Sequence, residues 1–486
     1  MRTYRRRYVL CVFALLAMGW QTHANAQEVT QPGQPGGASA STPLETGYVD
    51  LMAGLGYTDN AFLAGRQRTG DGIATAGLNV DYKRLGKLSL NLLGDLNRIQ
   101  YVHGSFGGSF YGHFIGSGVL GKPTDLLQWQ LHDTFGEAMT NPLAGPTPVN
   151  LQTINDVSTG PLVNLHFGLT NRLTMFGLYS RTTYQRSPFD SQTYQGGTQF
   201  LHALSGASSV SLSASIAHTK YVESAAVRTY FEGASSTYDI GQASISYDAK
   251  FVRTDVLLTA GYSAIRFGGA ARHGAPLYSI RLNRRISPFS TVFVGGAQRY
   301  STNGTAQASA GVQAGLQVGA SLSPGFAVAQ PFNERSADAG WQFNRARTNL
   351  SLTGTYRQMV FNQTSVNNDF NHQEESIAVV LGRQLRRTMG VQLLMQGYWD
   401  RYSQLDAKTR SESIQLTFSK RLVRTMVWFY IERWHQSGSP GRSSFLASSY
   451  NDDRVGIYVT YDLFGERPMQ PSLGGMPGMG GFAGGY

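Results

Sequence analysis

The sequence of 486 residues has a single cysteine, Cys11, and lacks any run of 18 apolar residues that could cross a bilayer as a helix. Cys11 lies in the apolar stretch 8–20, between the cationic start MRTYRRR and an A-x-A site that ends at Ala26. This pattern is typical of a secretory signal peptide, so we predict cleavage after residue 26. The mature chain would then contain no cysteine, which excludes disulfides and thiolate metal sites.

Charged residues are also scarce, at 15% of the chain. Removing the four arginines of residues 1–26 lowers the net charge from +11 to +7. The mature chain contains no clustered basic helix and no recognised nucleic-acid motif beside this positive charge. Nucleic acid is therefore not predicted as a partner. The ten histidines show no H-x-H or H-x-x-x-H spacing. We predict no metal site, no cofactor and no catalytic residue, so the protein is not expected to be an enzyme.

Glycine and aromatic residues are abundant, with 57 glycines, 25 tyrosines and 25 phenylalanines. The segment DDRVGIYVTYDLF, residues 452–464, alternates strictly: Val455, Ile457, Val459 and Tyr461 share one face, and polar residues occupy much of the other. Such alternation predicts a β-strand with one apolar and one polar face. In a chain of mean hydropathy −0.23, repeated strands of this kind indicate a β-barrel in the outer membrane of a Gram-negative cell.

We predict an all-β fold, a closed antiparallel transmembrane β-barrel of about 20 strands (range 18–22) over residues 46–464. Tight turns such as RLGK and LRRT alternate with longer polar loops such as 58–72, 139–155 and 437–451. An even strand number places both termini in the periplasm, with the long loops outside. Residues 27–45 would form a flexible periplasmic lead, and 465–486 a disordered Gly/Pro/Met-rich periplasmic tail. The long segment 302–335 could fold into the lumen as a constriction or form an extra surface hairpin.

The end of the predicted barrel resembles the closing-strand signal read by the outer-membrane barrel insertion machinery. The pattern is polar-x-Gly-x-x-apolar-x-aromatic, and the residues that carry it are Arg454, Gly456, Val459, Tyr461 and Phe464. The resemblance implies that this machinery is a partner. The sequence departs from the pattern in the tail of 22 residues after Phe464.

Two strands near the C-terminus carry polar and aromatic residues on the face that we assign to the lumen. These pathway candidates are Gln392, Gln396, Tyr398, Asp400, Trp428, Tyr430 and Glu432. Aromatic rings offer an apolar face to sugar C–H groups, while the polar side chains can hydrogen-bond to hydroxyl groups. Tyr402 and Trp434 fit either this face or the aromatic girdle at the membrane boundary.

The tight turns are rich in arginine. The basic periplasmic rim that we predict consists of Arg284, Arg285, Arg345, Arg347, Arg386, Arg387, Arg421 and Arg424. A positive mouth would concentrate an anionic polymer or an acidic partner protein. The alternative is that the rim only needs solvated charges at the membrane boundary.

The segment GLGYTDNAFL, residues 54–63, resembles the Y-x-D-N-x-F/L opening of a family of Gram-negative outer-membrane β-barrel porin-like proteins associated with exopolysaccharide (capsule or biofilm) loci. The resemblance implies a role in export or assembly of a secreted polysaccharide, with periplasmic export proteins as partners. Outer-membrane lipid and lipopolysaccharide would surround the barrel. Two other functions remain open: a general or substrate-selective diffusion porin, and a structural or adhesive surface barrel.

Overall fold

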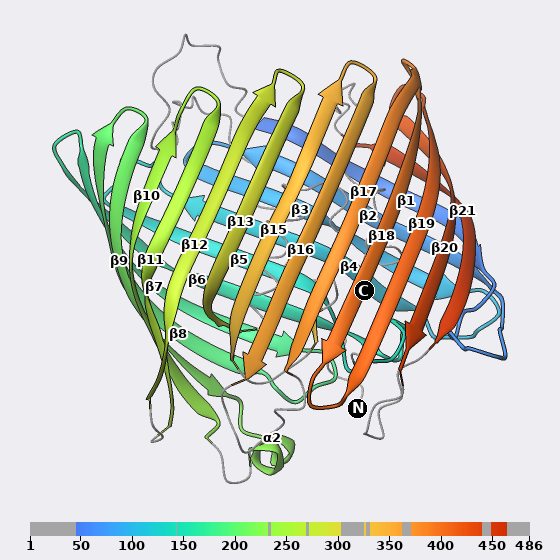
Figure 1. Cartoon of the computed structure of the whole chain (residues 1–486), viewed down its shortest axis with the longest axis horizontal. Coiled ribbons are helices and arrows are strands. Elements are labelled where there is room, and N and C mark those ends of the chain that lie inside the picture. Colours follow the sequence, from blue (N-terminus) through green and yellow to red (C-terminus); the bar gives the residue numbers. More distant parts are fainter. Residues whose placement is uncertain are drawn as a thin grey trace.

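The computed structural model describes residues 45–141, 143–231, 235–268, 272–302, 325–326, 331–361, 371–439 and 449–463. The signal peptide, nearly all of the lead, and the tail expected from the sequence lie outside these residues. The described chain consists mainly of long strands (Figure 1). They are β1 Glu45–Thr58, β2 Asp71–Arg84, β3 Leu88–Tyr101, β4 Ser109–Leu120, β5 Leu127–Met139, β6 Leu151–Phe167, β7 Asn171–Tyr184, β8 Ser191–Ser205, β9 Ser208–Tyr221, β10 Thr237–Lys250, β11 Thr254–Phe267, β12 Arg272–Ser287, β13 Ser290–Ser301, β14 Gly325–Phe326, β15 Phe332–Arg345, β16 Thr348–Phe361, β17 His372–Arg386, β18 Met389–Tyr402, β19 Ala407–Arg421, β20 Thr425–Gly438 and β21 Tyr450–Asp462.

All of these strands except β14 form one closed wall. Each strand pairs antiparallel with the next, β13 pairs directly with β15, and β1 pairs with β21 from Asp50↔Asp462 to Thr58↔Arg454. The prediction of a closed antiparallel barrel of about 20 strands is therefore confirmed. One short helix, α2 (Ala225–Tyr230), lies in the connection between β9 and β10. Among the described residues, no helix is both long and apolar enough to cross a membrane.

The two faces of the wall differ as the alternation predicts. On β21 the outward side chains Ile457 and Tyr461 are 46% and 44% exposed, whereas Tyr458 and Thr460, which point inward, are 2% and 1% exposed. The exposed set around the barrel is rich in Leu, Ile, Val, Phe and Tyr. Apolar side chains on the outside of a closed barrel, with polar ones inside, are the arrangement of a barrel that spans a membrane.

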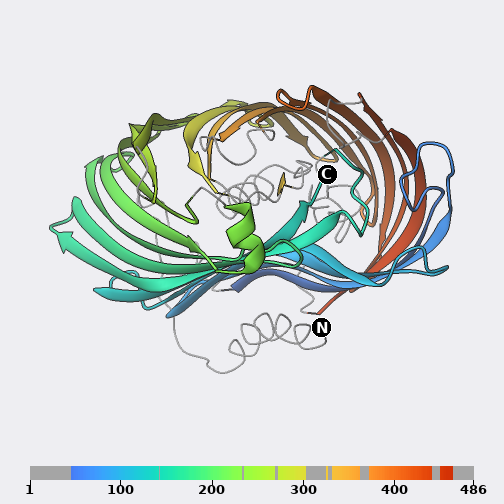
Figure 2. The same ribbon diagram turned by 90° about the horizontal axis from the view of Figure 1, so that it is seen from below.

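The connections at the two rims differ in length. Short turns such as 346–347 and 422–424 lie at one rim, and both ends of the wall lie there too, because Glu45 pairs with Arg84 and the amide of Asp462 bonds to the oxygen of Arg424. The longer connections lie at the other rim, which Figure 2 shows from below. The assignment of the short-turn rim to the periplasm remains a prediction.

Candidate functional site: a constriction inside the barrel

The end of β5 separates from β4 while it stays paired with β6 as far as Met139↔Leu151. β4 and β5 pair only from Phe114↔Phe135 to Leu120↔Trp129, which leaves the last four residues of β5 without a β4 partner. Ala138 and Met139 pair instead with β14, in parallel. Figure 2 shows this end of β5, in teal, inside the ring of strands. It directs the connection 140–150 into the lumen.

This position corrects one sequence-based expectation. The sequence predicts that the polar loop 139–155 stands outside, whereas residues 151–155 begin β6 and the described part of the connection 140–150 lies within the barrel. For the segment 302–335, the sequence leaves two alternatives open: a constriction inside the lumen or an extra surface hairpin. Of its central part only Gly325 and Phe326 are described, and they pair with the inward end of β5. Residues 303–324 and 327–330 lie outside the described residues.

Asn150 holds the inward connection in one conformation. Its amide nitrogen donates to the main-chain oxygens of Asn141 (2.9 Å) and Gly145 (3.1 Å). Its amide oxygen accepts from the hydroxyl of Thr140 at 2.9 Å and from the amide of Asn141 at 2.8 Å. Arg186, in the next connection, donates to the main-chain oxygens of residues 148 and 149. These bonds satisfy polar groups that leave water when the connection enters the barrel.

The connection packs against strands distant from it in sequence. Leu143 is fully buried and forms an apolar cluster with Tyr402, Leu405 and Ala407, from the β18–β19 hairpin. At Gly145 a β-carbon would lie 2.9 Å from Leu63 Cδ1 and 3.0 Å from Tyr450 Cε1. The connection is therefore anchored to the opposite side of the lumen.

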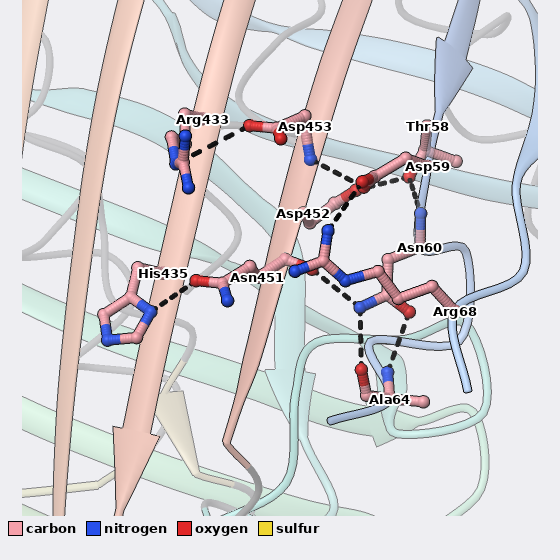
Figure 3. A network of polar contacts seen from close by, with 10 residues as sticks. All are labelled: Thr58, Asp59, Asn60, Ala64, Arg68, Arg433, His435, Asn451, Asp452 and Asp453. Carbon is pink, nitrogen blue, oxygen red and sulfur yellow. Dashed lines mark hydrogen bonds and ion pairs between the residues drawn. The ribbon is translucent and has the colours of Figure 1, made fainter. Parts of the chain in front are cut away.

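A second inward segment follows β1, and it contains the motif that resembles the exopolysaccharide-associated family. Figure 3 shows Asn60 donating to the main-chain oxygens of Ala64 (2.9 Å) and Asn451 (2.7 Å). The hydroxyl of Thr58 donates to Asp452 at 2.5 Å, and the amide of Asp453 to the Asp59 carboxylate at 2.8 Å. The Asp-Asn pair of the motif thus closes the seam between β1 and β21.

Beyond this seam the segment turns inward at Leu63, whose φ of 50° is unusual for a residue other than glycine. Leu63 packs against Trp434 and Tyr450, and these three side chains form one buried cluster. Trp434 is 2% exposed and Tyr402 is 4% exposed, so both belong to the packed interior and not to a girdle at the lipid boundary.

The pathway candidates on β20 point inward but are covered. Trp428, Tyr430 and Glu432 are 6%, 2% and 1% exposed. Trp428 and Tyr430 lie in an apolar cluster that includes Leu151, at the end of the inward connection, and Tyr430 stacks on Tyr458 with ring centroids 5.5 Å apart. A molecule in the lumen reaches these rings only if the cover moves.

The candidates on β18 lie beside a row of charges. Gln396 and Tyr398 are buried and Gln392 is half-buried, while the carboxylate of Asp400 accepts a hydrogen bond of 3.1 Å from Thr409. Arg357 on β16 lies 3.7 Å from Glu374 and 3.4 Å from Glu334. The sequence analysis missed this row because its members lie on separate strands and no spacing rule links them.

The wall formed by β8–β11 presents a different inner face. Its strands contact one another through hydroxyl pairs: Thr193–Thr219, Ser213–Ser244 and Ser246–Thr259, each 2.9 Å. Five of these six residues are half-buried, in contrast to the closely packed face of β18–β21. This face offers small hydroxyl groups to water or to a hydrated solute.

The basic rim residues all lie at or next to the short turns. Seven of the eight are exposed and Arg421 is half-buried. Arg345 lies over the ring of Phe289, with its guanidinium carbon 5.7 Å from the centroid.

The residues of the closing-strand signal divide between the two faces. Val459 and Tyr461 face outward, whereas Arg454 points inward and bonds to Asp452 at 2.5 Å. A β-carbon at Gly456 would lie 2.4 Å from Tyr430 Cε1, so a larger residue there would displace the Tyr430 ring. Phe464 lies outside the described residues.

No family model and no curated protein matches this sequence. Solved structures that resemble it include the FrpB iron transporter from Neisseria meningitidis (F5-1 variant), with 9% identity, TM-score 0.41, and coverage of 85% of this chain and 82% of that one. The siderophore receptor PirA from Acinetobacter baumannii has 11% identity and TM-score 0.47, over 86% of this chain and 81% of that one. The copper transporter OprC has 8% identity and TM-score 0.42, over 86% and 80%. Superpositions this loose carry no inference about transport or cargo, so the barrel assignment rests on the strand pairing itself.

Proposed function

We propose that the protein is an outer-membrane channel that takes part in the export of a secreted exopolysaccharide. In this proposal the connection 140–150 and the segment after β1 are a gate, and the short-turn rim faces the periplasm. The observation that carries the proposal is that these two segments meet in the lumen, at Gly145 and Leu63, on the side where the aromatic face of β20 is covered.

The chemistry of the inner surface supports a hydrated, hydroxyl-rich cargo. The β8–β11 face presents Ser and Thr hydroxyls, and the covered face contains Trp428, Tyr430 and Glu432. Opening the gate would place aromatic rings opposite the hydroxyl face. Sugars use both kinds of contact, and weak repeated contacts let a chain slide. The exposed arginines of the basic rim would attract an acidic polymer toward the entrance.

A reversible disulfide across the gate tests this proposal. A β-carbon at Gly145 would lie 3.2 Å from the β-carbon of Leu63, and disulfides need a separation of about 3.8 Å, so G145C with L63C requires only a small shift. The predicted mature chain offers no competing thiol. We expect the oxidised double variant to show lower single-channel conductance and less surface polysaccharide than its reduced form, with G145C and L63C alone as controls.

The outcomes separate the three functions. Conductance that does not change on oxidation would rule out the gate. A change in conductance with unaltered polysaccharide would favour a diffusion porin. No conductance in either state, with loss of surface attachment in a deletion strain, would favour an adhesive barrel.

A further inference from the structure

A groove of about 520 Å³ lies on the outside of the barrel wall, away from the lumen. It crosses five neighbouring strands, β5–β9, and its lining residues include Trp129, Pro161, Gly177, Tyr194, Gly196 and Ile216. Trp129, Tyr194 and Ile216 are 49%, 56% and 62% exposed, like the other outward apolar side chains. The groove therefore faces the membrane.

Glycines form the floor of the groove. A β-carbon at Gly177 would meet nothing within 4 Å, and at Gly196 the nearest atom would be 3.9 Å away. Tyr179 and Tyr194 stand over this floor with ring centroids 5.3 Å apart, and Trp129 is fixed by a 2.8 Å hydrogen bond to Thr159. Because Gly177 and Gly196 have no side chains, the space between these aromatic rings forms a groove that an extended apolar chain can fill. At about 4.8 Å per strand step, it is roughly 19 Å long.

One end of the groove is cationic. His218, which lines the groove, bonds to Asp239 at 2.7 Å, and Arg266 donates to the same carboxylate at 2.9 Å. One step nearer the long-loop rim on the same face lie Arg181 and Lys220, both paired with Gln192 on β8. Arg272, opposite Arg266, is also exposed.

Three acidic side chains balance part of this charge. Asp239 is shared by His218 and Arg266, Glu223 lies 3.5 Å from Lys220, and Asp190 interacts with Arg181. Against these three stand the four exposed cations Arg181, Lys220, Arg266 and Arg272. An apolar groove that ends in a net positive patch at the membrane boundary matches a lipid with acyl chains and an anionic headgroup.

We propose that this groove binds one acyl chain of a phosphate-bearing lipid, with the phosphate held by Lys220 and Arg181. The site is independent of the cargo of the channel. If the long loops face outward, the lipid belongs to the leaflet that contains lipopolysaccharide. The apolar floor supplies the affinity, and the cations select the headgroup.

Native mass spectrometry of the delipidated full chain in detergent tests the site, with bisphosphorylated lipid A and its dephosphorylated form as probes. The double variant Gly177→Leu/Gly196→Leu fills the floor without a backbone clash. We expect its affinity for lipid A to fall about tenfold or more, because the acyl chain loses its apolar contact. The matched control is Gly241→Leu, since Gly241 pairs with Ile216 on the same face, has open space around it, and lies outside the groove.

A second variant, Arg181→Gln/Lys220→Gln, tests the headgroup. We expect it to bind both probes equally, because its preference for phosphate is lost. Unchanged lipid A binding by the filled variant would overturn the proposal. Equal binding of the two probes by the unaltered protein would overturn the assignment of the phosphate. A dimer in the unaltered protein that the filled variant abolishes would identify the groove as a contact between two copies of the chain, and would also overturn it.

Discussion

The side-chain amide of Asn60 donates a hydrogen bond of 2.7 Å to the main-chain oxygen of Asn451, across the seam where the first and last strands of the wall meet. The two residues are 391 positions apart. The same amide bonds to Ala64, so one buried side chain both fastens the closure and starts the inward turn of the segment after β1. Closure of the barrel and entry of this segment into the lumen are therefore coupled.

Asn60→Asp tests this coupling. The substitution keeps the shape and the oxygen that accepts from the amide of Ala64, but it loses both donated bonds and buries a charge. We expect a loss of about 1–3 kcal/mol in the stability of the folded barrel, because buried partners are left unsatisfied. The measurement is a series of samples incubated at increasing temperature before electrophoresis. The temperature at which the band of the folded barrel disappears reports its stability. The control is Asn344→Asp, at an exposed position near the end of β15, and an equal effect there would contradict a special role for the seam.

Leu143→Ala should loosen the inward connection without unfolding the wall. Leu143 is fully buried against the β18–β19 hairpin, and removal of such a side chain costs about 2–5 kcal/mol of local packing. We expect a higher mean conductance and more frequent current steps in planar bilayers. Leu169→Ala is the control, because Leu169 is fully exposed in a short turn. A conductance equal to that of the control would mean that Leu143 does not hold the constriction.

The wall could be predicted from the sequence because its signal is local. Each strand repeats an apolar–polar alternation, as in Val455–Tyr461, and the pattern fixes which face meets lipid wherever the strand lies. The inward faces of β18 and β20 could be assigned in the same way. The count of about 20 followed from the number of such segments.

The cover over the lumen could not be predicted in this way. The sequence of 140–150 contains three prolines, one glycine and four polar residues, as expected of an outer loop. Its place inside depends on contacts such as Leu143 with Ala407, which no local pattern encodes. For the same reason the sequence could place Trp428 and Tyr430 on the lumen face but could not show that they are packed.

Replacement of Trp428 and Tyr430 by Ala should destabilise the barrel. Both side chains are nearly fully buried, and truncation of a buried aromatic residue costs about 3–5 kcal/mol. We therefore expect a clear fall in the thermal midpoint in detergent. Phe429→Ala/Ile431→Ala, on the outward face of the same strand, should have a smaller effect because these side chains are 40% and 50% exposed. A normal midpoint for the double variant of Trp428 and Tyr430 would show that their cover contributes no packing energy.

The basic rim should give the channel a preference for anions. Arg345, Arg347, Arg386 and Arg387 are exposed at neighbouring short turns, so their charges add at one mouth. We expect replacement of all four by Gln to move the reversal potential in a dilute salt gradient toward cation preference. The shift should fade at 1 M salt, where the screening length is only about 3 Å. Arg335, Arg410 and Arg433 are exposed near the opposite rim and point outward from the wall, so their replacement by Gln is the control. A similar shift from both sets would mean that selectivity follows total charge. No shift from either set would mean that charges inside the barrel, such as the row of Arg357, Glu334 and Glu374, set the selectivity instead.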